Sequence, residues 1–152
     1  MSIIKKLGLP SVTIRYTFLG CACITLWKGK YFISLKRRNK QDFYHELGHV
    51  FFNVHRDSMD MIKFKALFGD PDKLYIMPYI EWIKSVFGAE EEKAKKGFIS
   101  DYASSHPRED FCETFSEALE EVLTGVSYDY KDTMVNKKVA FVKKVIKKTI
   151  NA

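Results

Sequence analysis

The strongest constraint on this chain is an H-E-x-x-H pattern, His45-Glu46-Leu47-Gly48-His49. Residues four apart lie one above the other on a helix, with about 6 Å of axial rise between them, so both imidazoles can reach one metal ion. The glutamate after the first histidine then projects beside the metal, where its carboxylate can take a proton from a zinc-bound water. The pattern therefore predicts a helical zinc site and the chemistry of a metallopeptidase.

The residues around this motif favour a helix. Asn39 can cap its start, because an asparagine side chain accepts a hydrogen bond from a free backbone N–H in the first turn. Apolar residues then recur at helical spacing on one face, at Phe43, Leu47, Val50, Phe51 and Val54. Both histidines are therefore predicted to lie on one helix.

A catalytic zinc ion usually takes three protein ligands and keeps a fourth position for water, so this site needs one more ligand. Residues 107–115 offer Glu109 and Glu113, which are four apart and share a helix face. One carboxylate can bind the metal while the other accepts the free ring N–H of a ligating histidine. Acidic residues are also common in a helix's first turn for capping and dipole reasons, and that is the alternative for Glu109 taken alone.

Three further candidates are predicted to have structural roles. Asp110 lies about 100° around the helix from Glu109 and is predicted to be a first-turn acid. His55 and His106 are predicted to be a helix-end residue and a cap residue, not metal ligands. The predicted zinc site therefore draws on His45, His49 and a downstream carboxylate.

The cysteines and the N-terminus indicate an intracellular protein. Cys21 and Cys23 lie two apart in a predicted strand, where a disulfide between them would be strained. With Cys112 they are predicted to be reduced thiols, too few for a cysteine-based zinc site. Lysines interrupt the short apolar start of the chain, and no run approaches the length of a membrane span, so we expect neither a signal peptide nor a transmembrane segment.

Hydrophobic patterning predicts one α+β domain over residues 1–152. Three segments rich in β-branched and aromatic residues, 11–18, 22–27 and 31–36, predict a small N-terminal antiparallel meander. Helices are predicted beyond it, near residues 58–68, 78–87 and 107–124 in addition to the motif helix. Pro107 suits the first turn of the last of these, and Gly125 its end.

The net charge of +6 is concentrated in the tail, since residues 131–152 carry seven lysines and one aspartate. Val135, Val139, Val142, Ile146 and Ile150 recur at helical spacing there, with lysines between them. We expect a C-terminal amphipathic helix docked by its apolar stripe, with its lysines in solvent. Binding to nucleic acid or to a membrane surface through 131–152 is the less favoured alternative. Oligomeric state is not indicated by the sequence.

Several motifs in one order carry a family resemblance. They are His45-Glu46-Leu47-Gly48-His49, then Leu67-Phe68-Gly69-Asp70, then the stretch from Gly97 to Phe115 that includes Ser100-Asp101-Tyr102-Ala103 and His106-Pro107-Arg108-Glu109-Asp110. Together they resemble a family of bacterial zinc-binding metallopeptidases of the H-E-x-x-H…Glu, or gluzincin, type. A looser similarity extends to the lethal-factor and Pro-Pro endopeptidase group, in which a tyrosine precedes the glutamate ligand by seven residues.

This resemblance implies a zincin-like fold, with the sheet packed on a helical region that carries the motif helix and a glutamate-ligand helix. It implies a single Zn²⁺ held by His45, His49 and Glu109. It also implies that Tyr102 stabilises the transition state and that Glu113 orients a ligand. Arg108 and Cys112 depart from the family pattern, and we expect both to alter the shape of the cleft but not metal binding.

Two functions are consistent with these residues. In the first, zinc-bound water attacks a peptide bond of a peptide or protein substrate, Glu46 acts as general base, and Tyr102 binds the developing oxyanion. In the second, the zincin scaffold and its zinc serve as a binding module without proteolysis. Intact Glu46 and Tyr102 favour the first, because a site that has lost its activity need not keep them.

Overall fold

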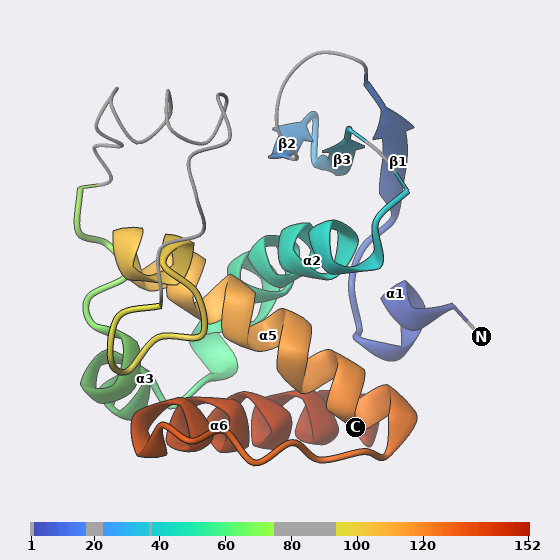
Figure 1. The fold of residues 1–152 in the computed structure, drawn as a ribbon. Coiled ribbons are helices and arrows are strands. Elements are labelled where there is room, and N and C mark those ends of the chain that lie inside the picture. Colours follow the sequence, from blue (N-terminus) through green and yellow to red (C-terminus); the bar gives the residue numbers. More distant parts are fainter. Residues whose placement is uncertain (1, 18–22, 37, 75–93) are drawn as a thin grey trace.

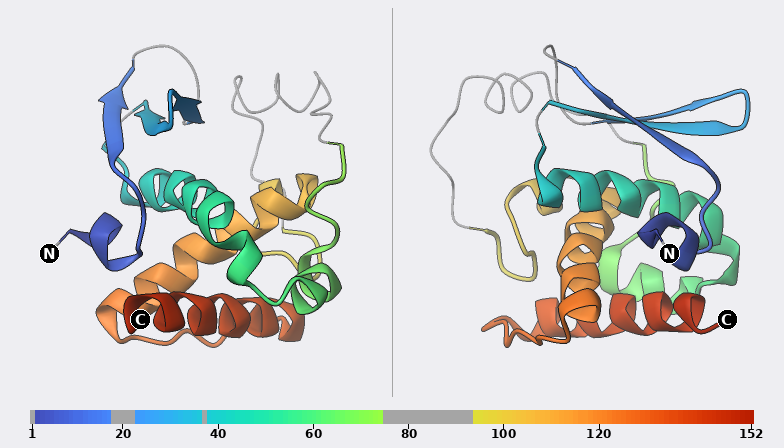
Figure 2. Two further views of the ribbon diagram at one scale, coloured as in Figure 1. Left: turned by 180° about the vertical axis from the view of Figure 1, so that it is seen from behind. Right: turned by 90° about the vertical axis from the view of Figure 1, so that its right-hand side faces the viewer.

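The computed structural model describes residues 2–17, 23–36, 38–74 and 94–152, and it confirms the α+β class. Figure 1 shows a small sheet above helix α2 (Lys40–His55), with α5 (Pro107–Thr124) crossing below α2. Helix α6 (Thr133–Ile150) forms the base, and the turned views of Figure 2 show α5 running between α2 and α6. The motif helix is therefore covered by the sheet on one side and by helices on the other.

The sheet differs from the predicted meander. Its strands are β1 (Val12–Tyr16), β2 (Cys23–Trp27) and β3 (Lys30–Leu35), in the order β1-β3-β2. β2 and β3 form the expected antiparallel hairpin, but β1 pairs in parallel with β3, so an all-antiparallel meander is wrong. Alternating apolar residues define the two faces of a strand, but they do not determine which strand it pairs with. In the observed order β3 is the central strand, and its Ile33 is fully buried.

The predicted helices mostly follow their local signals. The side chain of Asn39 caps α2, His106 caps α5, and Gly125 ends α5 in a left-handed conformation with φ 74°. The helix expected near residues 58–68 is shorter, because a 3₁₀ turn, η1 (Arg56–Ser58), precedes α3 (Met61–Phe68). A short helix, α1 (Ile3–Lys6), and a 3₁₀ turn, η2 (Tyr102–Ser105), complete the described elements. The helix predicted at 78–87 lies outside the described residues.

A cluster of phenylalanine rings joins the helices below the sheet. Phe52 of α2 lies 5.2 Å from Phe64 of α3 and 5.5 Å from Phe111 of α5, measured between ring centroids. Phe51 lies 4.9 Å from Phe115 of α5. Each of these rings is at most 2% exposed, and burying one contributes about 1.5–3 kcal/mol to folding. This cluster therefore fixes α2 against α5, the two helices that carry the predicted zinc ligands.

Gly48 lets α2 and α5 approach closely between the two histidines of the motif. A Cβ atom on this residue would lie 3.2 Å from the backbone Cα of Cys112 and 3.1 Å from the Phe115 ring. Both contacts are shorter than ordinary van der Waals separations, and a helix backbone cannot move away as a flexible side chain can. A side chain at this position would therefore require α2 and α5 to shift apart by a few tenths of an ångström where they cross.

Replacing Gly48 with alanine is expected to destabilise the protein, although alanine is the better helix former by about 1 kcal/mol. Overpacking of a filled core costs about 1–3 kcal/mol and outweighs that gain. We expect a lower midpoint in thermal unfolding of the metal-free protein. Asn53→Ala, at an exposed position on the same helix, is the control and should leave the midpoint unchanged or raise it. An unchanged midpoint in the Gly48 variant would contradict this account.

Helix α6 docks by its predicted apolar stripe, since Val135, Val139, Val142 and Ile146 are buried. The expectation that its lysines lie in solvent is wrong for Lys138, which is 2% exposed and forms an ion pair with Asp110 of α5 at 2.6 Å. A buried ammonium group needs such a partner, because leaving it unpaired in a low-dielectric interior is costly. Asp110 is thus more than a first-turn acid.

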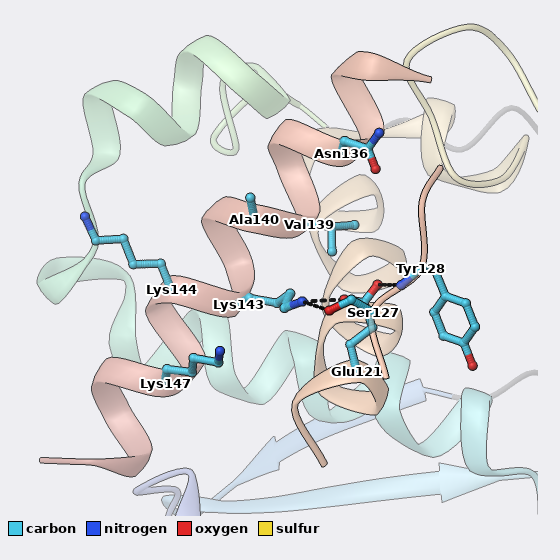
Figure 3. Close-up of a pocket in the computed structure, with 9 residues that line it drawn as sticks. All are labelled: Glu121, Ser127, Tyr128, Asn136, Val139, Ala140, Lys143, Lys144 and Lys147. Carbon is cyan, nitrogen blue, oxygen red and sulfur yellow. Dashed lines mark hydrogen bonds and ion pairs between the residues drawn. The ribbon is translucent and has the colours of Figure 1, made fainter. Parts of the chain in front are cut away.

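A second lysine of α6 also has a specific partner. Figure 3 shows Lys143 reaching the carboxylate of Glu121 and the hydroxyl of Ser127. These residues line a surface hollow of about 430 Å³. Glu121 in turn accepts a hydrogen bond from the backbone N–H of Tyr128 at 3.1 Å. These contacts tie the connection between α5 and α6 to both helices.

Among the described residues, no helix is both long enough and apolar enough to cross a bilayer.

Candidate metal centre

His45 and His49 point from one face of α2 toward the first turn of α5, with their ring centroids 5.1 Å apart. The Oε2 atom of Glu109 lies 3.1 Å from Nε2 of His45 and 3.3 Å from Nε2 of His49. These three side chains are only 11–19% exposed. The fold thus brings the two imidazole nitrogens of α2 together with a carboxylate oxygen from a residue 60 or more positions later in the chain.

The spacing of these atoms fits a zinc ion. Zinc binds imidazole nitrogen and carboxylate oxygen at about 2.0–2.2 Å in tetrahedral geometry, which places neighbouring ligand atoms about 3.3 Å apart or slightly more. The distances from Glu109 to the two histidines, 3.1 and 3.3 Å, lie close to that separation. The three residues could therefore hold a zinc ion with small side-chain adjustments.

Cys112 is a second possible donor at this centre. Its sulfur and the ring nitrogens of His45 and His49 form a group whose ligand atoms lie within 4.8 Å of one another. The expectation that Cys112 bears only on the shape of the cleft is therefore too narrow. Burial, together with the nearby carboxylates of Glu109 and Glu46, raises the pKa of the Cys112 thiol, which disfavours the thiolate that a metal would need. The carboxylate of Glu109, by contrast, has its pKa lowered, despite burial, by hydrogen bonds to the two histidines and is already ionised.

Glu113 contacts the other nitrogen of the first histidine. Its Oε1 atom lies 2.6 Å from Nδ1 of His45, on the side of the ring away from Glu109. With the proton on Nδ1, this ring donates to Glu113 and its Nε2 is free for a metal. Helix spacing alone left open which of the two glutamates faces the metal, and the family resemblance implied Glu109 as the ligand and Glu113 as the partner of the histidine. The distances are consistent with that assignment, which stays a prediction.

Ser100 extends this arrangement by one more residue, which sequence reasoning missed. Its hydroxyl donates to Oε2 of Glu113 at 2.8 Å and accepts the backbone N–H of Ala103 at 3.0 Å. Ser100 does stand in one of the family-like motifs, but a serine hydroxyl is not a usual zinc ligand, so its spacing gave no signal. Only the folded chain shows that it contacts Glu113.

In the metal-free protein, hydrogen bonds between His45 and the two glutamates stabilise the charged forms of all three side chains. Burial alone would lower the pKa of His45, but hydrogen bonds to Glu109 and Glu113 outweigh it and raise that pKa to about 10. Burial alone would raise the pKa of both glutamates, but their hydrogen bonds to histidine hold it below the usual range. At neutral pH both glutamates are therefore ionised and His45 is protonated, so a metal ion that binds Nε2 of His45 has to displace a proton from that nitrogen.

Glu46 and Tyr102 lie at the same centre. Glu46 is 5% exposed. Burial raises its pKa, although the charges of His45 and His49 oppose the shift. The Tyr102 ring is 44% exposed, and its centroid lies 5.9 Å from that of His45. One buried carboxylate and one accessible phenol therefore flank the histidines.

The other candidate residues have structural contacts, as predicted for the two histidines outside the motif. His55 bonds the carbonyl of Leu7 through Nε2 at 2.9 Å. His106 bonds the carbonyl of Lys73 at 2.9 Å and caps α5. Arg108 donates to the carbonyl of Pro71 at 2.9 Å, which ties the start of α5 to the turn after α3. These contacts leave His45 and His49 as the pair available for a metal.

Comparison with known proteins places the chain in a described family. A family model described as "Putative zinc-binding metallo-peptidase" matches residues 40–149, from the start of α2 almost to the end of α6. The chain belongs to this family. The zinc-binding metallopeptidase match therefore includes the basic tail, which the sequence motifs did not cover, and leaves the N-terminal sheet outside.

Similar curated proteins have no described activity. Uncharacterized proteins of Mycobacterium tuberculosis (strain H37Rv) and Mycobacterium bovis are each 37% identical to this chain over 79 residues. The match covers 51% of this chain but only 22% of each relative, so it spans about a fifth of those proteins. No solved structure matches the chain.

Proposed function

We propose that this chain is a zinc-dependent peptidase that hydrolyses peptide bonds in peptide or protein substrates. The observation that carries the proposal is the position of Glu109, whose Oε2 lies 3.1 and 3.3 Å from the Nε2 atoms of the two motif histidines. Family membership supports it, because the family is described as "Putative zinc-binding metallo-peptidase". His45, His49 and Glu109 would hold one zinc ion, in a domain with the zincin-like arrangement.

Each neighbouring residue has a role in this proposal. A zinc ion bound here would act as a Lewis acid and lower the pKa of a coordinated water to about 7. Glu46 accepts a proton from the attacking water and returns it to the leaving amine, and its buried position, which raises its pKa, makes it a stronger base. Glu113 holds the His45 ring so that Nε2 faces the metal.

Tyr102 is proposed to stabilise the negative charge that develops on the substrate carbonyl oxygen. Its ring lies beside His45 and the residue is partly exposed, so a substrate bound at the metal would lie near it. One hydrogen-bond donor in this role is commonly worth about 2.7–4 kcal/mol of transition-state stabilisation. The basic residues of α6 are not part of the proposed site.

The rival function is a binding module that keeps the metal but does not cut peptides. Purified protein should be analysed for its metal content and then incubated with a peptide library, with and without a chelator. Peptide cleavage that the chelator removes and added zinc restores is the expected result. Bound zinc without any cleavage would favour the binding module, and the absence of bound zinc after zinc loading would contradict both functions.

A further inference from the structure

We propose that Ser100 is a positioning residue for the metal centre, acting through Glu113 on His45. This inference rests on the proposed zinc site and goes beyond its ligands. The Ser100 hydroxyl donates to one carboxylate oxygen of Glu113 at 2.8 Å, and the other oxygen of that carboxylate lies 2.6 Å from Nδ1 of His45. A single carboxylate is thus held at both oxygens, by a serine on one side and by the histidine on the other.

The effect of Ser100 follows from the freedom of the Glu113 side chain. A glutamate side chain has three rotatable torsions, so one hydrogen bond to His45 leaves its carboxylate free to rotate or swing away. The second hydrogen bond, from Ser100, fixes the carboxylate plane and so the direction from which it accepts the Nδ1 proton. That direction sets the orientation of the His45 ring and of its Nε2 atom.

Ser100 is itself held in place by two sets of contacts. Within its own segment, its hydroxyl accepts the N–H of Ala103 at 3.0 Å, which orients the O–H toward Glu113. Three residues earlier, both backbone groups of Gly97 are bound. The N–H of Gly97 donates to Asp132, the N-cap residue of α6, at 2.7 Å, and the carbonyl of Gly97 accepts from Lys138 of α6 at 2.6 Å. The basic helix therefore anchors the segment that carries Ser100.

Lys138 strengthens this anchor. Its ammonium group also pairs with Asp110 at 2.6 Å and lies 4.3 Å from the centroid of the Phe98 ring. Asp110 follows the proposed ligand Glu109 directly, so the lysine joins the first turn of α5 to the segment before Ser100. A variant of Lys138 would leave the buried Asp110 charge unpaired and perturb folding, so it is not the variant that tests the inference.

The test is Ser100→Ala in the full-length protein, with zinc affinity measured by competition with a chromogenic chelator. Loss of an outer partner of a metal-bound histidine typically lowers metal affinity about 10- to 100-fold, and we expect about tenfold here. Ser100→Thr, which keeps the hydroxyl, should restore most of the affinity. Ser104→Ala is the matched control: among the described residues, the Ser104 hydroxyl donates to the carbonyl of Asp101 and does not contact Glu113, and this variant should bind zinc as tightly as the parent.

A double variant distinguishes positioning from a general structural effect. If Ser100 acts through Glu113, Ser100→Ala should cause no further loss of affinity in a protein that already carries Glu113→Ala, whereas independent losses would add. The thermal unfolding midpoints of the metal-free variants show whether each one folds. The cobalt-substituted Ser100→Ala protein should also show a shifted visible spectrum, because ligand orientation at the metal changes.

The outcomes separate this inference from the proposed function. Parental zinc affinity in a folded Ser100→Ala protein would overturn the inference and leave the zinc site intact. Additive losses in the double variant would overturn it as well, by assigning Ser100 an effect independent of Glu113. Failure of the parent protein to bind zinc would overturn the proposed function and this inference together. Peptide cleavage is not needed for any of these measurements.

Discussion

Replacing Glu46 with glutamine is expected to abolish peptide hydrolysis while zinc stays bound. Glutamine keeps the size of the side chain but cannot accept the proton of the attacking water, and general acid–base catalysis typically contributes about 10²- to 10⁴-fold to the rate. The expected loss in kcat is therefore at least about 100-fold. The measurement is cleavage of the best peptide from the library digestion, together with the zinc content of the purified variant.

Asp57→Asn is the control for Glu46→Gln. It makes the same acid-to-amide change at an exposed residue just beyond the end of α2, and it should leave both rate and zinc content unchanged. A zinc-loaded Glu46→Gln protein with full activity would contradict the proposed mechanism. Loss of zinc from this variant would instead show that Glu46 contributes to metal binding.

Replacing Glu109 with glutamine is expected to cause the largest loss of zinc affinity among single changes outside the motif. The variant loses the negative charge that balances the metal and the ionised oxygen that lies near both Nε2 atoms. Because loss of an outer partner alone lowers metal affinity about 10- to 100-fold, loss of a direct ligand should exceed about 100-fold. Competition with a chelator of known affinity gives this value.

Cys112→Ala is the comparison that decides the donor set. With Glu109 as ligand, this variant should bind zinc within a few-fold of the parent, and the cobalt-substituted parent should lack the strong near-ultraviolet band of a thiolate ligand. The opposite pattern, with zinc lost from Cys112→Ala and retained in Glu109→Gln, would assign the centre to His45, His49 and Cys112. The structure permits both donor sets, and the ionisation of Glu109 favours the first.

Local rules predicted the helix ends well because each depends on residues a few positions apart. Asn39 caps α2, Pro107 occupies the first turn of α5, and Gly125 ends α5, all as the sequence indicated. The apolar stripe of α6 was also confirmed, since helical spacing alone determines which residues share a face. Residues close together in the sequence determine these caps and this apolar stripe, so distant parts of the chain are not needed to predict them.

The errors arose where the choice of a partner is not local. The pairing of β1 with β3 depends on which strand edge is available and on burial of the central strand. The alternation of apolar residues in 11–18 carries no information about either of these. Lys138 was predicted to be solvated with the other tail lysines, yet it is buried against Asp110. A lysine's own sequence context does not reveal that a carboxylate 28 positions away will meet it.

By itself the sequence determined the kind of chemistry: two histidines one helical turn apart, a glutamate beside them, and two downstream carboxylates on a shared helix face. The tertiary structure decided how these groups meet. Close packing of α2 and α5 at Gly48, held by the phenylalanine cluster, brings Glu109 to both histidines and Glu113 to the far side of His45. The same packing gives Ser100 its contact with Glu113. Spacing along a helix can be read from the chain, but distances between helices depend on the packing of the whole core.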